Sequence, residues 1–181
     1  MLELRLNPAI AMRLIERRHA AALFDLVESG REDFQQWIPF VSKTKTQEDA
    51  FACILRFLDM YKEGKGYVYG LWDGRKMIGN VLIKDVDDAA KTAEIGYMVA
   101  RAYRGQGLAL AASRHMIDFI FGELGFQKIA LCCDDRNEAS IAIARRLGFE
   151  LEGVIKRCVV INGDLCNTMH WALFRPEVAT A

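Results

Sequence analysis

The chain has 181 residues, 52% of them hydrophobic, and its 24 Lys and Arg residues balance 24 Asp and Glu. We therefore expect residues 1–181 to form a single domain, and the zero net charge argues against direct nucleic-acid binding. Glu3, Arg5 and Arg13 interrupt the amino-terminal segment, which therefore does not resemble a signal peptide, and no apolar run has the length of a membrane span. These features favour a cytoplasmic protein without membrane attachment.

The amino-terminal third is predicted to be mainly helical. Residues 18–29 have a helical pattern, and residues 31–40 read as a short helical piece that ends before Pro39. A longer helix is predicted within residues 46–66, where Thr46 and Asp49 resemble a capping pair. Its apolar residues at helical spacing are expected to share one face; they are Phe51, Ile54, Leu55, Leu58 and Tyr61.

The rest of the chain alternates between β and α patterns. Asp73-Gly74 and Asn162-Gly163 are typical hairpin turns. Strands are predicted at 67–72, 76–83, 93–100, 128–133, 152–161 and 165–174, and helices within 103–122 and 137–149. This order predicts a mixed α/β (α+β) domain with a mostly antiparallel sheet, and not a regular Rossmann array.

The stretch "YRGQGLALAASRHMIDFIFG" places two glycines, Gly105 and Gly107, directly before a helix. Free N–H groups and the positive end of the helix dipole attract anions there, and glycine lets a phosphate approach closely. A tight turn without a ligand is an equal alternative on glycine spacing alone. Two other phosphate loops do not fit, because Leu110 replaces the third Rossmann glycine and the Gly-Lys-Ser/Thr ending of a P-loop is absent.

The segment Arg104-Gly105-Gln106-Gly107-Leu108-Ala109 resembles the (Arg/Gln)-x-x-Gly-x-(Gly/Ala) signature of the GCN5-related N-acetyltransferases. Asn137, Ser140, Gly148 and Phe149 match the downstream N-x-x-[A/S]…G-F segment of that family. The stretches "WIPF", "AEIGYMV" and "EGVIKRCVVINGD" are similar to the RimJ/RimL subgroup, which acetylates the amino termini of ribosomal proteins. The resemblance extends over nearly the whole chain.

This resemblance implies that acetyl-CoA is the co-substrate. The backbone of the glycine turn, from Arg104 through Gly105, Gln106, Gly107 and Leu108 to Ala109, would bind the pyrophosphate of coenzyme A. The strand before the turn would splay away from the strand at 128–133, and the backbone of Met98 and Val99 would pair with the pantetheine arm. Asn137 would contact the coenzyme, with a helix N-cap as its structural alternative.

Acetyl transfer needs a neutral amine and a stabilised thiolate, and two residues are candidates for these tasks. Glu94, at the start of the splayed strand, is the candidate base, and a water relay or a solvated carboxylate are the alternatives. Many family members have a tyrosine acid where this chain has Ala144, so Ser140 is the candidate for contact with the thiolate. As N3 of the helix, Ser140 also has a structural alternative.

The resemblance places the acceptor near Trp37, Phe40, Tyr67 and Tyr69, and core packing is the alternative for each of them. Relatives often have an acidic residue or histidine where this chain has Asn167, so a protein amino terminus, a small amine and an amine-bearing antibiotic all stay open. The oligomeric state also stays open, with a homodimer among the options.

Three rival hypotheses accompany direct transfer in a ternary complex. The five cysteines, with no C-x-x-C and only scattered histidines, indicate reduced thiols and no metal site, but Cys132 or Cys133 acting as an acyl carrier is a mechanistic rival. A non-catalytic acyl-CoA-binding module and a nucleotide-binding regulator are the rivals from other classes.

Overall fold

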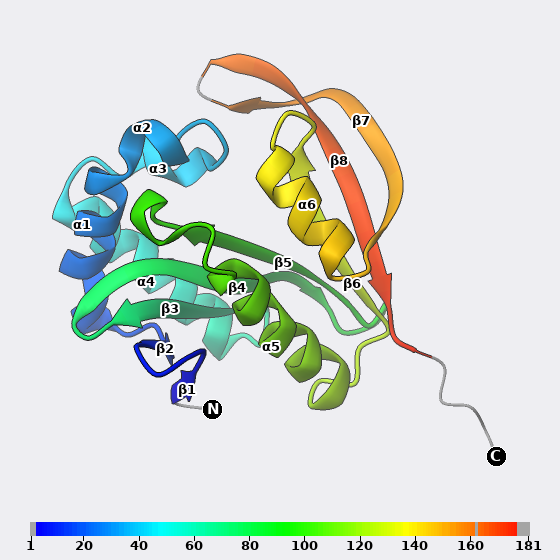
Figure 1. The fold of residues 1–181 in the computed structure, drawn as a ribbon, viewed down its shortest axis with the longest axis horizontal. Helices are drawn as coiled ribbons and strands as arrows, with labels where there is room; N and C mark the ends of the chain where they lie inside the picture. Colours follow the sequence, from blue (N-terminus) through cyan, green and yellow to red (C-terminus); the bar gives the residue numbers. More distant parts are fainter. Residues whose placement is uncertain (1–2, 162, 177–181) are drawn as a thin grey trace.

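The computed structural model describes residues 3–161 and 163–176, which include an eight-stranded sheet of order β1-β2-β3-β4-β5-β6-β8-β7 (Figure 1). Neighbouring strands are antiparallel except for β5 and β6, which are parallel. This confirms the predicted mixed α/β fold with a mostly antiparallel sheet. The strands are β1 (Glu3–Arg5), β2 (Ile10–Leu14), β3 (Tyr67–Asp73), β4 (Lys76–Asp87), β5 (Thr92–Val99), β6 (Lys128–Asp134), β7 (Glu150–Ile161) and β8 (Asp164–Phe174).

Helices cover the two faces of the sheet. One apolar core joins α1 (Ala20–Ser29), α2 (Arg31–Phe34), α3 (Pro39–Lys43) and α4 (Gln47–Lys62) to one face. A larger core lies between the other face and α5 (Leu108–Gly122) and α6 (Glu138–Arg146). Short 3-10 turns occur at Arg17–His19 and Arg101–Tyr103. Among the residues described, no helix combines the length and apolar character that crossing a membrane requires.

Helix α4 confirms one local prediction and corrects another. Thr46 is its N-cap and forms the capping box with Asp49. The predicted apolar face is confirmed for Ile54, which is buried, and is wrong for Phe51 and Tyr61, which are exposed (42% and 45%). The helix is rotated so that the face it buries is Ala50, Cys53 and Ile54.

The segment around Pro39 and the amino terminus also differ from the predictions. The helical piece expected at 31–40 is divided, since α2 ends at Phe34 and Pro39 begins α3 at a position where its missing N–H costs no hydrogen bond. Strands β1 and β2 were not predicted. Both predicted hairpins form, with Gly74 and Gly163 in the left-handed region, while Asn162 of the second turn lies outside the described residues.

Strands β5 and β6 pair over only three residues each. Their register ends where Glu94 pairs with Ala130, although β6 continues to pair with β8 as far as Asp134. In the described part of the chain, no strand pairs with the rest of β5, from Ile95 to Val99, on its β6 side. The predicted splay of the central strands is therefore confirmed, and it opens the sheet in the middle.

Candidate active site

A cavity of about 770 Å³ occupies the splay between β5 and β6. The glycine turn and α6 line it on one side, and the segment from α2 to α3, with Phe57 of α4, lines it on the other. Val159, Ile161 and Thr168 of the β7–β8 hairpin complete the wall. A cavity that reaches both faces of the sheet gives two ligands separate approaches to one point on β5.

The glycine turn presents unpartnered backbone N–H groups to the cavity. Gly105 and Gly107 have φ values of +76° and +72°, which L side chains rarely adopt. The first hydrogen bond within α5 runs from Ala111 N to Gly107 O, so the N–H groups of Leu108 and Ala109 have no partner within the helix. With the positive end of the helix dipole, they form a site that suits a phosphate anion.

Arg104 differs from the other residues of the turn. Its backbone N–H donates to Arg101 O, and its Nε donates to Val99 O at 3.1 Å. Its Nη2 lies 2.6 Å from a carboxylate oxygen of Asp33, so its charge is balanced within the protein. Arg104 therefore ties the end of β5 to α2. Gln106 is exposed and does not line the cavity, whereas Gly105, Gly107, Leu108 and Ala109 do.

Strand alternation separates the side chains of β5 between the two faces of the sheet. Met98 packs in the core of α1 to α4, and Glu94 has the same parity. Tyr97 and Val99 pack on the opposite face, in the core of α5 and α6. The candidate base and the side chains around the coenzyme turn thus approach β5 from opposite sides.

Glu94 is held at the point where the strands separate. Its Oε1 lies 2.8 Å from Nζ of Lys84, directly across from it on β4, and the Glu94 side chain is only 16% exposed. Although burial alone would lower the pKa of Lys84, hydrogen bonds to Asp85 and Glu94 raise it. Lys84 is therefore a charged partner that fixes the Glu94 carboxylate at the cavity wall.

Asn137 and Ser140 lie at the start of α6 and both line the cavity. Oδ1 of Asn137 accepts a hydrogen bond from the Ser140 backbone N–H at 3.1 Å, so the predicted N-cap is present. This bond leaves the amide nitrogen of Asn137 and the hydroxyl of Ser140 free for a ligand.

Tyr97 of β5 lines the same cavity as Ser140. Its hydroxyl oxygen is buried and makes no hydrogen bond of standard geometry to the residues that the structure describes. Burial raises the pKa of Tyr97 to about 12, while the nearby Ser140 hydroxyl opposes this rise and Cys133 adds to it. The phenol is therefore protonated at neutral pH.

The two cysteines of β6 line the cavity as thiols. Burial, followed by the charge of Glu94, raises the pKa of Cys132 to about 12. Burial also raises the pKa of Cys133 to about 11. Because the thiolate is the nucleophilic form, these shifts disfavour an acyl-carrier role for either residue.

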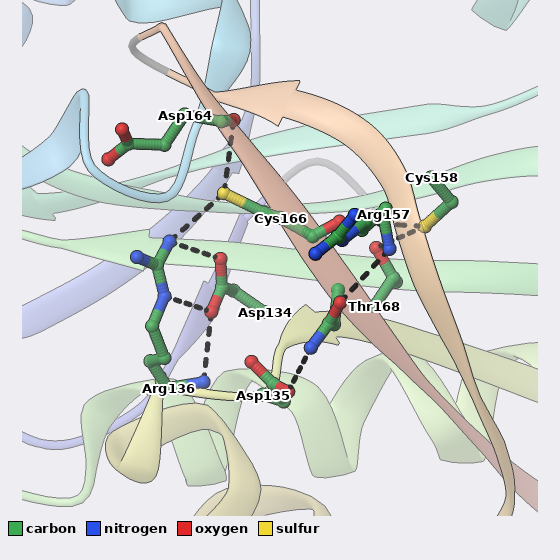
Figure 2. A network of polar contacts seen from close by, with 9 residues as sticks. Asp134, Asp135, Arg136, Arg157, Cys158, Asp164, Cys166 and Thr168 are labelled. Carbon is green, nitrogen blue, oxygen red and sulfur yellow. Dashed lines mark hydrogen bonds and ion pairs between the residues drawn. The ribbon is translucent and has the colours of Figure 1, made fainter.

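A polar network holds the terminal hairpin against the end of β6 and the loop that leads to α6 (Figure 2). The buried Asp134 carboxylate accepts hydrogen bonds from Nε and Nη2 of Arg136 at 2.9 and 2.8 Å, and Nη2 also contacts Sγ of Cys166 at 3.0 Å. Asn167 donates to Asp135 at 2.7 Å. The side-chain hydrogen bonds with Arg136 hold the pKa of Asp134 at about 2 against the smaller opposing effect of burial.

Only two of the four aromatic residues predicted for acceptor binding reach the cavity. Trp37 and Phe40 line it. Tyr69 is 4% exposed in the sheet core, and Tyr67 packs edge-on between Tyr61 and Phe119, so neither lines the cavity. Both sit on β3, away from the splay.

Sequence reasoning missed several residues of the lining. Phe34 and Phe57 add aromatic surface, and Tyr97 and Asn80 add polar groups. Asn80 is 1% exposed, and neither of its side-chain polar atoms has a hydrogen-bond partner within residues 3–161 and 163–176. Its position inside the apolar run "KMIGNVLI" could have indicated this burial.

A splayed sheet with an anion-binding helix start at one side of its gap defines a class of enzyme, the coenzyme A-dependent acetyltransferases. The family model described as the acetyltransferase (GNAT) domain matches residues 10–150, and the chain belongs to this family.

Relatives cover almost the whole chain. YdaF of Bacillus subtilis (strain 168), named provisionally as a ribosomal N-acetyltransferase, is 27% identical over 179 residues, or 98% of this chain and 97% of YdaF. Spermidine N(1)-acetyltransferase of Escherichia coli (strain K12) is 33% identical over 105 residues, covering 58% of this chain and 56% of the relative.

Solved structures agree on the fold. RimL, a ribosomal L7/L12 alpha-N-protein acetyltransferase solved with coenzyme A, matches with a TM-score of 0.90 over 95% of this chain and 97% of its own, at 23% identity. Together, the family and the relatives identify the chain as an acetyl-CoA-dependent N-acetyltransferase.

Proposed function

We propose that this chain acetylates the α-amine of a protein amino terminus by direct attack on acetyl-CoA in a ternary complex. The cavity that reaches both faces of the splayed sheet is the observation that carries the proposal, because it gives each substrate its own entrance. The names of YdaF and RimL support the choice of a ribosomal or other protein acceptor.

On the coenzyme side, the free N–H groups at the start of α5 bind the pyrophosphate. Met98 and Val99 lie on the part of β5 without a β6 partner, so their backbone groups pair with the pantetheine arm as an added strand would. Asn137 contacts the same arm through its free amide nitrogen. A backbone N–H of β5 polarises the thioester carbonyl.

On the acceptor side, Trp37 and Phe40 contact the residues that follow the attacking amine. Glu94 takes the proton of the α-amine, which titrates near ~8 and so needs only a modest base or a water relay. The amine nitrogen bonds to the carbonyl carbon as the carbon–sulfur bond breaks. Ser140 then donates a hydrogen bond to the departing thiolate.

A polyamine is the second candidate acceptor, because the match to spermidine N(1)-acetyltransferase has the higher identity over its shorter length. The decisive experiment incubates the enzyme and acetyl-CoA with peptides of varied first residue, the same peptides with a blocked α-amine, and spermidine. We expect one acetyl group on the free peptide amino termini alone, detected by mass spectrometry. Acetylation of spermidine alone would replace the proposal, and coenzyme binding without any transfer would favour the non-catalytic module.

The cellular location and the assembly belong to the same proposal. All five cysteines are free thiols, which supports a reducing cytoplasmic location. A homodimer and the absence of direct nucleic-acid binding stay predictions, which sedimentation of the purified protein with and without added RNA would test.

A further inference from the structure

Tyr97 is a buried phenol that the mechanism above does not use. It lies on β5 between the proposed pantetheine contacts and Glu94, and it lines the cavity. Its hydroxyl oxygen is shielded from water and makes no hydrogen bond of standard geometry among the described residues. Buried hydroxyl groups in proteins are nearly always paired, so this one calls for a partner.

Ser140 is the residue that can supply the partner. Its side chain, from α6, is near enough to influence the pKa of the phenol, and both residues line the same cavity. Ser140 is fixed at its backbone, because its N–H donates to Asn137 at the N-cap. Its hydroxyl, by contrast, makes no hydrogen bond of standard geometry among the described residues, so it can rotate toward the nearby phenol.

The direction of a hydrogen bond between the two hydroxyls follows from their chemistry. A phenol that stays protonated is the better donor, and the serine oxygen has two lone pairs with which to accept. Once Ser140 Oγ accepts from Tyr97, its own hydrogen points away from Tyr97. Because Ser140 lines the cavity, this hydrogen is available to a ligand inside it.

We propose that Tyr97 is a positioning residue, whose buried hydroxyl donates to Ser140 Oγ and turns the Ser140 hydrogen toward the sulfur of the departing coenzyme. The inference rests on the proposed function, since it requires that Ser140 contacts the thiolate. The phenol of Tyr97, from β5, thereby orients a hydroxyl at the start of α6. In this chain α6 has Ala144 at the position where many family members have a tyrosine acid.

Tyr97 and Ser140 keep their own protons during the reaction. The carbon–nitrogen bond forms, the carbon–sulfur bond breaks, and the bonding pair stays on sulfur. The proton of the amine leaves through Glu94 or water to solvent, and the thiolate takes a proton from solvent. The two hydroxyls only stabilise the charge that develops on sulfur, so the loss of Tyr97 should lower turnover and leave coenzyme binding unchanged.

The test compares Tyr97→Phe, Ser140→Ala and the double variant by steady-state kinetics with a peptide that the wild type acetylates. We expect Tyr97→Phe to lower kcat on the order of tenfold, the effect of one charge-stabilising hydrogen bond, with an unchanged KM for acetyl-CoA. Tyr69→Phe is the matched control, because Tyr69 is a buried tyrosine outside the cavity; its kcat should equal that of the wild type.

The double variant separates positioning from a general structural effect. If Tyr97 acts through Ser140, Tyr97→Phe causes no further loss of kcat in the Ser140→Ala background. If the two residues act independently, the two fold-losses of kcat multiply in the double variant. Wild-type kcat in Tyr97→Phe, or the same fold-loss in both backgrounds, would overturn the inference while the proposed role of Ser140 stands.

Two further readouts keep the outcomes distinct. Full turnover in Ser140→Ala alone would remove Ser140 from the mechanism, and the inference with it, but would leave acetylation of peptide amino termini intact. Thermal unfolding of Tyr97→Phe should stay close to that of the wild type, because only one hydrogen bond between two hydroxyl groups is lost. A lower kcat together with a much lower unfolding temperature and a raised KM would indicate a packing role and would also overturn the inference.

Discussion

The two sides of the cavity are built in different ways. Most of the coenzyme side is one continuous piece of chain, from β5 through the glycine turn into α5, which presents mainly backbone N–H groups, and the start of α6 completes it. The acceptor side combines side chains of α2, α3, α4 and the β7–β8 hairpin, which are far apart in the sequence. Backbone recognition suits a co-substrate that never changes, while assembled side chains allow the acceptor to vary on the same fold.

Glu94 stands between the two sides, and its substitution should have the largest effect. Glu94→Gln should lower kcat/KM about 100-fold at neutral pH, because the loss of a general base costs at least that much. The deficit should shrink as the pH rises through ~8, where the α-amine loses its proton without help. The measurement is the pH profile of both enzymes. A constant deficit at all pH values would instead assign Glu94 a structural role through its ion pair with Lys84.

The glycine turn tests whether the coenzyme side depends on the backbone. Gly107→Ala places a side chain at a φ of +72°, which costs about 1–2 kcal/mol and shifts the first N–H groups of α5. We expect the KM for acetyl-CoA to rise about tenfold with little change in the KM for the peptide. Gly122→Ala, at the other end of α5 and free of neighbouring atoms, is the control and should bind acetyl-CoA normally.

Trp37 tests the opposite side. Trp37→Ala removes apolar contact with the peptide that is worth on the order of 1 kcal/mol, so the KM for the peptide acceptor should rise several-fold. The KM for acetyl-CoA should stay unchanged. Phe51→Ala, an exposed aromatic residue of α4 outside the cavity, should change neither value. An equal rise in the KM of both substrates in Trp37→Ala would mean that the coenzyme side and the acceptor side of the cavity are not separate binding sites.

The same contrast explains how far the sequence could be interpreted. Local signals were sufficient for the hairpin at Asp73-Gly74 and for the N-caps Thr46 and Asn137, because each is completed within a few residues. The resemblance of one continuous segment to a known signature was sufficient for the coenzyme turn. These features need no knowledge of distant contacts.

Features made by distant residues were missed or misplaced. No local pattern in the sequence indicates that Asp33, far away in the chain, forms an ion pair with Arg104. Strand tyrosines look alike in a sequence, and only the position of the splay separates Tyr97, which lines the cavity, from Tyr67 and Tyr69, which do not. The rotation of α4 depends in the same way on the surfaces that pack against it.

The hairpin network adds a pH-dependent element to the acceptor side. The folded-state pKa of Asp134, about 2, lies below its ordinary value of 3.8, so its stabilisation is complete above about pH 4 and is lost as the pH falls toward 2. Because Arg136 is half exposed to water, we expect this ion pair to contribute about 1 kcal/mol to the free energy of unfolding. Asp134→Asn should lower the free energy of unfolding by this amount at pH 7. At pH 2 the variant and the wild type should be equally stable. Asp88→Asn, which breaks an exposed ion pair with Lys91, is the control and should have no measurable effect.

The smallest effect is expected where the two sides meet, at the cysteines of β6. In direct attack, neither Cys132 nor Cys133 carries the acetyl group, and their raised pKa values leave almost no thiolate at pH 7. The double substitution Cys132→Ser with Cys133→Ser should therefore keep kcat within about threefold of the wild type, the residual change coming from altered packing beside Glu94. Intact mass spectrometry of the wild type with acetyl-CoA and no acceptor should show no acetyl adduct. An adduct that the double variant lacks, together with lost turnover, would replace direct attack by a two-step route and would make the cavity a single site used in turn by both substrates.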